Sequence, residues 1–358
     1  MSNTICVDDY TVVGLIGSGS FGKVYKIIRK SDGKVLVWKE IHYGSMTDKE
    51  KQLLVGEVNI IKDLRHAFIV RYYDRIIDRE NKKIYIIMEY CPCGDLSNFV
   101  KKLKKDKKSL DEEQVWRIFC QLAMALKECH VRKEGSPKII HRDIKPGNIM
   151  LDDNHDVKLG DFGLARMLGE DSHYAKTNVG TPYYMSPEQI NEKAYDEKSD
   201  IWSLGCVIYE LCMLSPPFEA MNHLSLAQKI NKGQYPAVSS KYTRVLSDLI
   251  RSMLTVDSSR RPSVDEICVS ANIVHRIKDT QMQLKYRFLK RREEEVRRKE
   301  KMLEEREKDL NNKERDLKKL ESYLSSKKLT LLVNTAASAA TNDNKENNSP
   351  IFKNFKCA

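Results

Sequence analysis

From Tyr10 to Tyr90, apolar and polar positions alternate in short runs. Three of these, "YTVVGLIG", "KVYKIIRK" and "KVLVWKEI", are separated by turn signals, and their alternation predicts an antiparallel meander. Two later runs, "IVRYYDRII" and "IYIIMEY", predict further strands. Between the two groups, "MTDKEKQLLVGEVNIIKDL" has apolar residues at helical spacing, with Thr47 as a suitable N-cap. The pattern therefore predicts a five-stranded sheet with one main helix.

Beyond Asp95 the apolar spacing becomes that of helices. The segments "EEQVWRIFCQLAMALKECH" and "DIWSLGCVIYELCML" each carry a strong helical stripe, so the residues from Met88 to Cys93 are expected to connect a sheet lobe to a helical lobe. The globular part is expected to end near Val274. A charged helical stretch then runs to about Lys328, and the polar residues 329–358 are expected to form a disordered tail.

Composition narrows the class of protein and its partners. The net charge of the 358-residue chain is +11, which favours an anionic partner, but much of this charge lies in the run Lys101–Lys108 and in the C-terminal third. Such a run is more typical of a solvated loop than of a binding site, so nucleic acid is not favoured as a partner. The nine cysteines lack zinc-ligand spacing, no apolar run reaches membrane length, and we expect no secretory leader. We expect a soluble intracellular protein with free thiols and no membrane contact.

A glycine-rich motif lies between the first two predicted strands. "GSGSFG" at residues 17–22 matches G-x-G-x-x-G, and Val24 follows it. Alone, the motif suits a dinucleotide-binding fold, an ordinary turn or a phosphate-binding hairpin. Strand-like residues on both sides favour the hairpin, because a dinucleotide loop leads from a strand into a helix. Backbone N–H groups of such a hairpin approach phosphate closely, and Val24 would pack on a base.

Lys39 ends the third predicted strand, in "LVWKE". A lysine on a buried strand is costly unless its charge is paired. Glu57, in the middle of the following helix, is the expected partner, and the pair would hold Lys39 against two phosphates. The alternative for Glu57 is a solvated helix face, but its neighbours Leu54, Val58 and Ile61 favour the paired role.

Polar residues with complementary chemistry gather in "HRDIKPGN", between two apolar runs. Asp143 is suited to accept the proton of an attacking hydroxyl, Lys145 to neutralise a transferring phosphoryl group, and Asn148 to bind a metal. Asp161, on the tight turn of "LGDFG", is suited to chelate Mg²⁺. The neighbouring His141 is expected to be a packed, structural imidazole.

The glycine loop, Lys39, Glu57, "HRDIKPGN", "DFG" and "SPE" occur in the order that is typical of eukaryotic protein kinases, and the chain resembles that family from Tyr10 to Val274. The resemblance implies an α+β fold of two lobes, a kinase domain at residues 10–274, and the use of ATP and Mg²⁺. It implies that Glu188 pairs with Arg261 and that Asp200 holds the catalytic loop. "SPE" replaces the commoner A-P-E. Lys145 together with "GTPYYMSPEQ" follows the serine/threonine pattern.

Finer motifs, including "VLVWKEI", "VRYYDRIID" and "NVGTPYYMSPEQI", resemble the NIMA-related mitotic kinases, above all the centrosomal branch with a coiled coil after the kinase domain. The resemblance implies that Met88 is the gatekeeper and that Thr177 is a phosphosite facing Arg142. It also implies protein substrates and residence in the cytoplasm and at the centrosome, with the nucleus as a further location. The residues implied to contact the nucleotide are Ile16, Gly17, Gly19, Gly22, Val24, Lys39, Met88, Glu89 and Cys91.

An apolar residue recurs every seven positions after the kinase-like region. The row consists of Leu289, Val296, Leu303, Leu310, Leu317 and Leu324. Leucine at d would place glutamates at a, whereas leucine at a places mainly Arg and Lys at d, whose long stems can pack while their charges reach water. The second arrangement is favoured and predicts a homodimer through residues 281–328. The alternative is a lone charged helix with pairs such as Glu293/Arg297.

Two further alternatives remain at this point. Lys345-Glu346-Asn347 spells the KEN sequence by which mitotic ubiquitin ligases recognise substrates, although the same residues suit an ordinary polar tail. A catalytically silent kinase fold that assembles partners through its coiled coil is the alternative to an enzyme. Such proteins usually lose the equivalents of Lys39, Asp143 or Asp161, and all three are present here.

Overall fold

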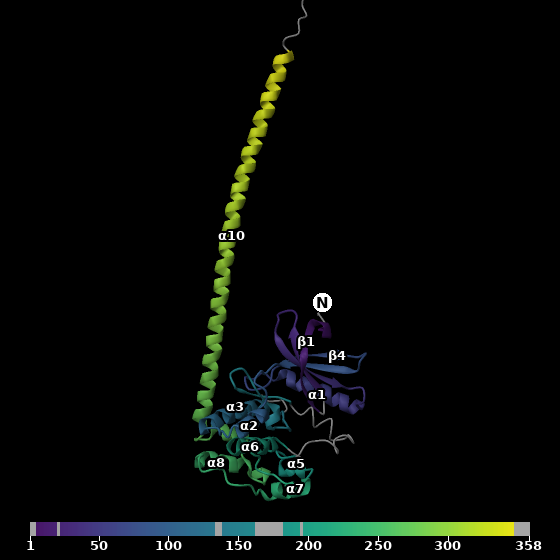
Figure 1. Cartoon of the computed structure of the whole chain (residues 1–358), viewed down its shortest axis with the longest axis vertical. Helices are drawn as coiled ribbons and strands as arrows, with labels where there is room; N and C mark the ends of the chain where they lie inside the picture. The colour runs from purple at the N-terminus through teal and green to yellow at the C-terminus, as the bar shows by residue number, and fades with distance from the viewer. Residues whose placement is uncertain (1–4, 20–21, 133–137, 162–181, 194–195, 347–358) are drawn as a thin grey trace, which may run out of the picture. The chain divides into compact units, whose positions relative to one another are not determined.

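The computed structural model describes residues 5–19, 22–132, 138–161, 182–193 and 196–346, and Figure 1 traces their path. Thr177 and Asn347 lie outside the described residues. The side chains of Glu57, Lys345 and Glu346 lie outside them too, although their backbones are in helices. The chain forms two compact units that divide between Leu284 and Lys285.

The N-terminal lobe is a five-stranded antiparallel sheet with one long helix, as predicted. Its strands follow the spatial order β1-β2-β3-β5-β4. Helix α1 (Asp48–Asp63) begins at Thr47, whose hydroxyl accepts from the backbone N of Glu50, so the predicted N-cap is confirmed. The strands are β1 (Tyr10–Gly19), β2 (Gly22–Arg29), β3 (Val35–His42), β4 (Tyr72–Asp78) and β5 (Lys83–Glu89).

The two faces of this sheet pack against different groups of residues. In β5, Ile84 and Ile86 join the main core with α1, whereas Tyr85 and Ile87 belong to a separate cluster with Trp38. The rings of Trp38 and Tyr85 lie 4.8 Å apart. Side chains of a strand point alternately to opposite faces, so the period of two that predicted the strands also divides the core.

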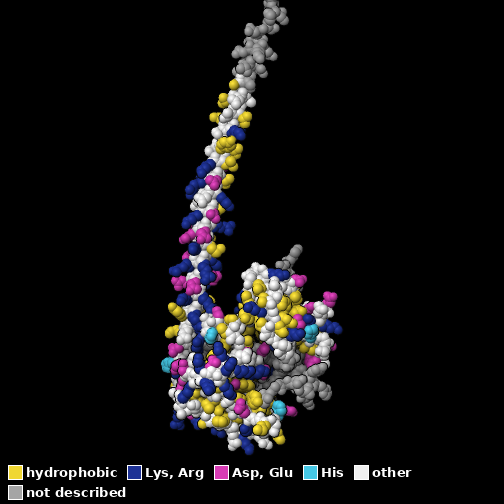
Figure 2. Space-filling model, in the orientation of Figure 1, with side chains coloured by type: hydrophobic (Ala, Val, Ile, Leu, Met, Phe, Trp, Pro, Cys, Tyr) yellow, Lys and Arg dark blue, Asp and Glu magenta, His cyan; other side chains and the backbone are white. Residues whose placement is uncertain are grey.

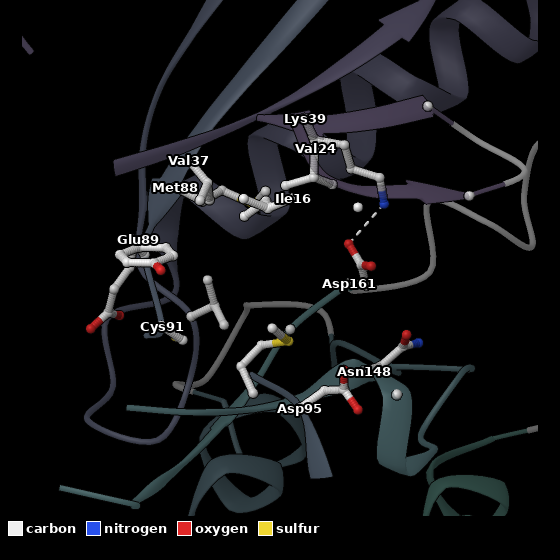
Figure 3. A pocket seen from close by; sticks show the side chains of 18 of the residues that line it. Ile16, Val24, Val37, Lys39, Met88, Glu89, Cys91, Asp95, Asn148 and Asp161 are labelled. Atoms are coloured by element: carbon white, nitrogen blue, oxygen red, sulfur yellow. Dashed lines mark hydrogen bonds and ion pairs between the residues drawn. The ribbon is translucent and has the colours of Figure 1, made fainter. Parts of the chain in front are cut away.

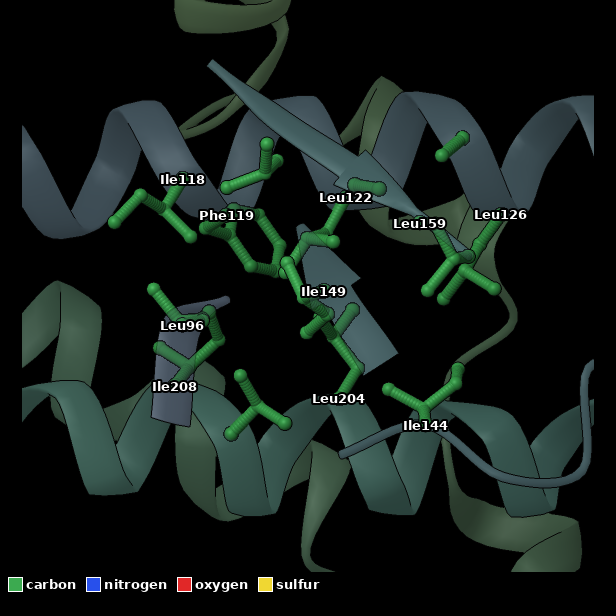
Figure 4. Packing of buried hydrophobic residues seen from close by; sticks show 14 of the residues in the cluster. Leu96, Ile118, Phe119, Leu122, Leu126, Ile144, Ile149, Leu159, Leu204 and Ile208 are labelled. Carbon is green, nitrogen blue, oxygen red and sulfur yellow. The ribbon is translucent and has the colours of Figure 1, made fainter. Parts of the chain in front are cut away.

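The second lobe is mainly helical, and its largest helices pack around a small β6–β7 hairpin. Figure 4 shows residues of α3 and α6 closing on Ile149 and Leu159 of that hairpin. The helices are α2 (Leu96–Lys105), α3 (Glu112–His130), α5 (Pro187–Ile190), α6 (Glu197–Met213), α7 (His223–Lys232), α8 (Arg244–Met253) and α9 (Val264–Val269). The strands are β6 (Ile149–Leu151) and β7 (Val157–Leu159), and short 3₁₀ turns span Val7–Asp9, Pro146–Asn148 and Ser258–Arg260.

The lysine run differs from the sequence prediction. Residues 101–105 continue α2 and are not part of a loop. Leu96 and Val100 are buried and Leu103 packs beside them, so an apolar face at helical spacing anchors the segment to the lobe. Lysine is itself a good helix former, and charge alone therefore does not identify a loop.

Helix α10 (Val274–Glu346) corrects both ends of the predicted C-terminal segment. At its start, Ile277 and Thr280 are buried and Leu284 packs on the core, so the first compact unit extends beyond the predicted boundary at 274. At its far end, residues 329–346, expected to be disordered, continue the helix. They include good helix formers such as Leu331 and Ala336, and no Gly or Pro interrupts the chain before Pro350. In the described ranges, no helix combines the length and apolar character needed to span a bilayer.

Candidate active site

A cavity of about 540 Å³ lies between the sheet and the polar segment that precedes β6. Figure 3 shows apolar side chains, Val37 and Met88 among them, toward one end, and Lys39 with Asp161 toward the other. The predicted site residues that line this cavity are Ile16, Gly17, Gly19, Gly22, Val24, Lys39, Met88, Glu89, Cys91, Asp143, Lys145, Asn148 and Asp161. The other two, Glu57 and Thr177, are those whose side chains the structure does not describe.

The glycine motif connects two antiparallel strands, as its flanking residues predicted. Gly22 has a φ of +147°, and a Cβ on it would lie 2.1 Å from the carbonyl oxygen of Glu40 on β3. No side chain fits in that space, so only glycine allows β2 to approach β3 so closely here. This packing holds the base of the glycine turn next to the cavity.

Lys39 on β3 is buried, and its charge is paired with Asp161. The Lys39 Nζ lies 2.7 Å from Asp161 Oδ1. The side chain of Glu57 is not described, so a pair between Lys39 and Glu57 stays a prediction. The Asp161 carboxylate is surrounded by protein but faces the open cavity, with 43% of its side-chain surface exposed. Burial would raise the pKa of Asp161, but the Lys39 ammonium outweighs it and holds that pKa below its usual value, so Asp161 is ionised.

Asp143 is the centre of a small polar cluster. Its Oδ2 accepts from Lys145 Nζ at 2.7 Å and from Asn148 Nδ2 at 2.8 Å. Asn148 Nδ2 also lies 2.8 Å from the backbone oxygen of Asp143. Because the amide NH₂ group faces Asp143, the amide oxygen of Asn148 is turned away from that carboxylate. A basic acceptor, a cation and an amide oxygen thus meet within one short segment.

Asp200 of α6 holds the backbone of the segment that contains Asp143 through hydrogen bonds. It is almost fully buried and accepts from the backbone N of His141 at 2.8 Å, from that of Arg142 at 2.9 Å and from His130 Nε2 at 2.8 Å. Burial opposes ionisation, but the His130 contact outweighs it and keeps the pKa of Asp200 below its usual value. Arg142 has a φ of 71°, a conformation that costs about 1–3 kcal/mol in a residue other than glycine. The bonds to Asp200 hold this strained backbone in place.

His141 is fully buried, which agrees with the structural role predicted for it. Its Nε2 lies 2.8 Å from the carbonyl oxygen of Gly160, and its Nδ1 accepts from the backbone N of Asp143 at 3.3 Å. Burial lowers the pKa of the imidazole, so His141 is neutral. The ring therefore links the segment of Asp143 to the residue before Asp161.

The predicted pair of Glu188 and Arg261 is confirmed. Arg261 Nη1 lies 2.8 Å from Glu188 Oε1, and Nη2 lies 3.2 Å from Oε2. The guanidinium also donates to the backbone oxygens of Thr255, Lys198 and Val256 and lies 5.1 Å from the ring of Trp202. This buried cation ties α5 to α6 and to the segment that follows α8.

Several residues that line the cavity were missed by sequence reasoning. Val37 lies two positions before Lys39 on the same strand, so the period of two could have identified it. Asp95 caps α2, and its Oδ1 accepts from the backbone N of Asn98 at 2.8 Å, but only the fold shows that it also reaches the cavity. Ser18, Val70, Tyr90, Gly147, Met150 and Gly160 complete the set.

Comparison with known proteins agrees with this geometry. The family model described as the protein kinase domain matches residues 10–273. The chain is 55% identical over 275 residues to the serine/threonine-protein kinase Nek2 of Mus musculus, a match that covers 77% of this chain. It is 52% identical over 291 residues to the probable serine/threonine-protein kinase nek2 of Dictyostelium discoideum, covering 81% of this chain and 69% of that protein.

A more distant relative is the G2-specific protein kinase nimA of Emericella nidulans, 40% identical over 310 residues, or 80% of this chain and 44% of that protein. The chain spans 62% of the length of the Mus musculus relative, less than two thirds. The similarity therefore concerns the kinase domain above all.

Proposed function

Since the chain belongs to the NIMA-related branch of the protein kinase family, we propose that it transfers the γ-phosphate of ATP to serine or threonine hydroxyls of protein substrates. The observation that carries this proposal is the convergence of Lys39, Asp143, Asn148 and Asp161 on one cavity beneath a glycine turn. The cavity volume, about 540 Å³, is in the range of small-molecule sites.

Each polar side chain has a role in this reaction. Asp143 accepts the proton of the attacking hydroxyl, and Lys145, 2.7 Å from that carboxylate, neutralises the phosphoryl group in transit. Lys39 holds two of the phosphates, with Glu57 as its proposed partner when the nucleotide is bound. The role of His141 is to position this segment through its contact with Gly160.

The residues at the polar end also fit Mg²⁺. This ion is usually held by one or two carboxylates together with substrate phosphates, and Asp161 and the amide oxygen of Asn148 would supply the protein ligands. The Lys39 ammonium lowers the pKa of Asp161, so this carboxylate is ionised, as a metal ligand must be. When bound, Mg²⁺ neutralises charge on the phosphate oxygens.

The apolar end of the cavity suits a planar base. Ile16, Val24, Val37 and Met88 provide its apolar surface, as Figure 3 shows. Met88 is the proposed gatekeeper, and the backbone groups of Glu89 and Cys91 would contact adenine edges. The two ends of the cavity thus match the base and the phosphates of ATP.

The test is phosphoryl transfer by the purified full chain from labelled ATP to casein in the presence of Mg²⁺. Asp143→Ala, Lys39→Met and Asp161→Ala should each lower the rate at least about a thousandfold, because each removes a group that stabilises the transition state. Asp153→Ala, an exposed aspartate on the β6–β7 turn, is the matched control and should retain activity. Near-normal turnover in any of the first three variants would refute the assignment. Failure of the parent to transfer phosphate while it binds ATP would favour the silent scaffold.

We also propose that a second copy of this chain pairs along α10. The leucine row is 44–67% exposed, so its apolar surface lacks cover within its own helix. A parallel dimer through residues 281–328 would bury this row and bring two kinase units together, which would favour phosphorylation of Thr177 between them. A role in cell division accords with the printed name of the G2-specific relative, and residence at the centrosome and in the cytoplasm is proposed from the resemblance to the NIMA-related kinases alone.

The KEN sequence is proposed as a contact for a mitotic ubiquitin ligase. Lys345 and Glu346 lie at the last residues of α10, where helix ends commonly fray. A receptor could therefore reach them at a small conformational cost. Timed destruction would limit the activity of a kinase that acts in division.

A further inference from the structure

The run Lys101–Lys108 forms a concentrated basic surface on α2 and the turn after it. Figure 2 shows Lys and Arg gathered over this part of the helical lobe. All six lysines are exposed, and Asp106 is the only acidic residue among them. We call this group the lysine patch; its members are Lys101, Lys102, Lys104, Lys105, Lys107 and Lys108.

The charge of the lysine patch is not balanced locally. Within the described part of the chain, none of its six ammonium groups makes an ion pair. Like charges three and four positions apart on a helix, such as Lys101 with Lys104 and Lys105, destabilise it. The helix dipole favours cations in the last turn of α2, but Lys107 and Lys108 lie beyond that helix.

Helix α10 differs from the lysine patch, because several of its basic side chains form ion pairs with acidic side chains of the same helix. There Arg292 and Lys299 both pair with Glu295, and Lys318 pairs with Glu314. The lysine patch has no such arrangement. Its excess positive charge is therefore available to an anionic partner.

The position of α2 relates this charge to the cavity. Its N-cap Asp95 lines the cavity, and its ten residues span about 15 Å, so the patch begins within one helix length of the site. Lys101 and Lys104 also act on Glu210 of α6: burial raises the pKa of that carboxyl, and the two ammonium groups oppose the rise. Glu210 in turn accepts from Tyr184 Oη at 2.6 Å. The patch thus lies toward the C-terminal end of the helix whose N-cap lines the cavity, and its charge reaches Glu210 of α6.

From this placement we propose that the lysine patch binds an acidic segment, rich in Asp or Glu, on the same polypeptide as the acceptor serine or threonine. The inference rests on the proposed kinase function and adds a substrate class to it. Exposed charges attract over about a Debye length and are screened by salt. Because the patch does not touch the reacting atoms, its effect falls on KM and leaves kcat unchanged.

The test uses the full chain and two peptides that share one acceptor sequence. One carries a run of glutamates through a flexible linker, and the other carries glutamines of the same number. We expect a KM about tenfold lower for the glutamate peptide, the result of several exposed ion pairs acting together, and equal kcat values. High salt should remove the difference.

A matched pair of variants locates the effect. Replacing Lys101, Lys104 and Lys105 with Gln should abolish the preference for the glutamate peptide and leave the kinetics of the glutamine peptide unchanged. Replacing Lys193, Lys232 and Lys278, which are exposed elsewhere on the first unit, with Gln removes the same charge and should preserve the preference. An equal loss in both variants would overturn the assignment to this patch, because it would show a general effect of net charge.

The remaining outcomes separate this inference from the proposed function. If neither peptide is phosphorylated, the kinase proposal itself fails. If both are phosphorylated with the same KM, only the substrate class is refuted. Tight binding of labelled single-stranded DNA that depends on Lys101, Lys104 and Lys105, without any peptide preference, would also refute it in favour of a nucleic-acid surface.

Discussion

The first compact unit and the later part of α10 use the same charged residue types in opposite ways. In the first unit, Arg261 is 1% exposed and donates to Glu188 and three backbone oxygens. In α10, Lys299 and Glu295 pair while their side chains remain 66% and 52% exposed. Breaking a buried pair costs about 3–5 kcal/mol, whereas an exposed pair contributes about 0–1 kcal/mol. Charged residues therefore stabilise the fold of the first region, whereas in the second they mainly keep the helix surface in contact with water.

Apolar residues show the same contrast. In the first unit, residues such as Leu204 and Ile208 are fully buried in a core shared by several helices. In α10, Leu303 and Leu310 are 67% and 59% exposed. One region completes its core within itself, and the other presents an apolar row suited to a second molecule.

The largest effect is expected from removing the buried guanidinium. Arg261→Ala should lower the free energy of unfolding by about 3–5 kcal/mol, because the Glu188 carboxylate is left in a buried site without its cationic partner. Arg292→Ala on α10 should change it by less than about 0.5 kcal/mol. Urea unfolding followed by tryptophan fluorescence measures both, since Trp38, Trp116 and Trp202 all lie in the first unit. Similar unfolding free energies for the two variants would contradict the proposed difference between buried and exposed ion pairs.

Acidification should also affect the first unit selectively. Burial, with a smaller effect from Lys158, lowers the pKa of His66 from 6.5 to about 4. The unfolded chain then binds a proton at a higher pH than the folded one, so the stabilisation is complete above pH 6.5 and is lost as the pH falls from 6.5 to 4. We expect a loss of about 2 kcal/mol between pH 7 and pH 5.

A pair of histidine variants tests this assignment. His66→Gln should flatten the dependence of the unfolding free energy on pH, with part retained by the buried His141, whose pKa is also lowered by burial. His42→Gln, the same substitution at a side chain that is 65% exposed, is the matched control. An unchanged slope in His66→Gln would contradict the prediction.

Pairing through the leucine row should respond to a single charge. Leu310→Asp places a carboxylate in the middle of the apolar seam and should raise the dimer dissociation constant at least about tenfold. Asn311→Asp adds the same charge beside the seam and should leave the dimer intact. Light scattering of the full chain measures both, and phosphorylation of Thr177 should fall in Leu310→Asp alone. A monomeric parent would remove the dimer proposal.

Truncation sharpens the boundary between the two regions. Because Ile277, Thr280 and Leu284 pack on the first unit, a cut after Leu284 should give a folded monomeric kinase. A cut after Val274 should be less stable, since it removes this buried turn and the 2.6 Å contact of Arg276 with Glu113. Equal unfolding free energies for the two fragments would place the boundary back at Val274.

The smallest structural effect is expected at the end of α10. Replacing Lys345, Glu346 and Asn347 with Ala should lengthen the lifetime of the protein in mitotic extract without changing kinase activity. Replacing Asn342, Asp343 and Asn344 with Ala provides the neighbouring control and should leave the lifetime as in the parent. Equal decay of the KEN variant and the parent would leave this segment as a polar end without that role.

Much of the fold could be predicted because its signals are local. The period of two predicted the five strands, and Thr47 marked the start of α1, where the structure adds Glu50 as its capping-box partner. The predictions for the lysine run and for residues 329–346 differ from the structure for a common reason: a polar composition does not by itself indicate a loop or disorder. A packed apolar face anchors the lysine run as part of α2. Helix propensity, without Gly or Pro, allows residues 329–346 to continue α10.

By itself the sequence determined which residues were available for chemistry, because motif spacing is a property of neighbours along the chain. It also determined the pair of Glu188 and Arg261 once the family pattern was recognised. Only the tertiary structure decided that Lys39 pairs with Asp161, 122 positions away, and that Asp95 and Val70 reach the same cavity. Such contacts depend on how separate elements pack around a shared core, and local periodicity does not contain that information. The physical limit is therefore distance along the chain: local preferences are encoded within a few residues, whereas a site is assembled by burial across the whole unit.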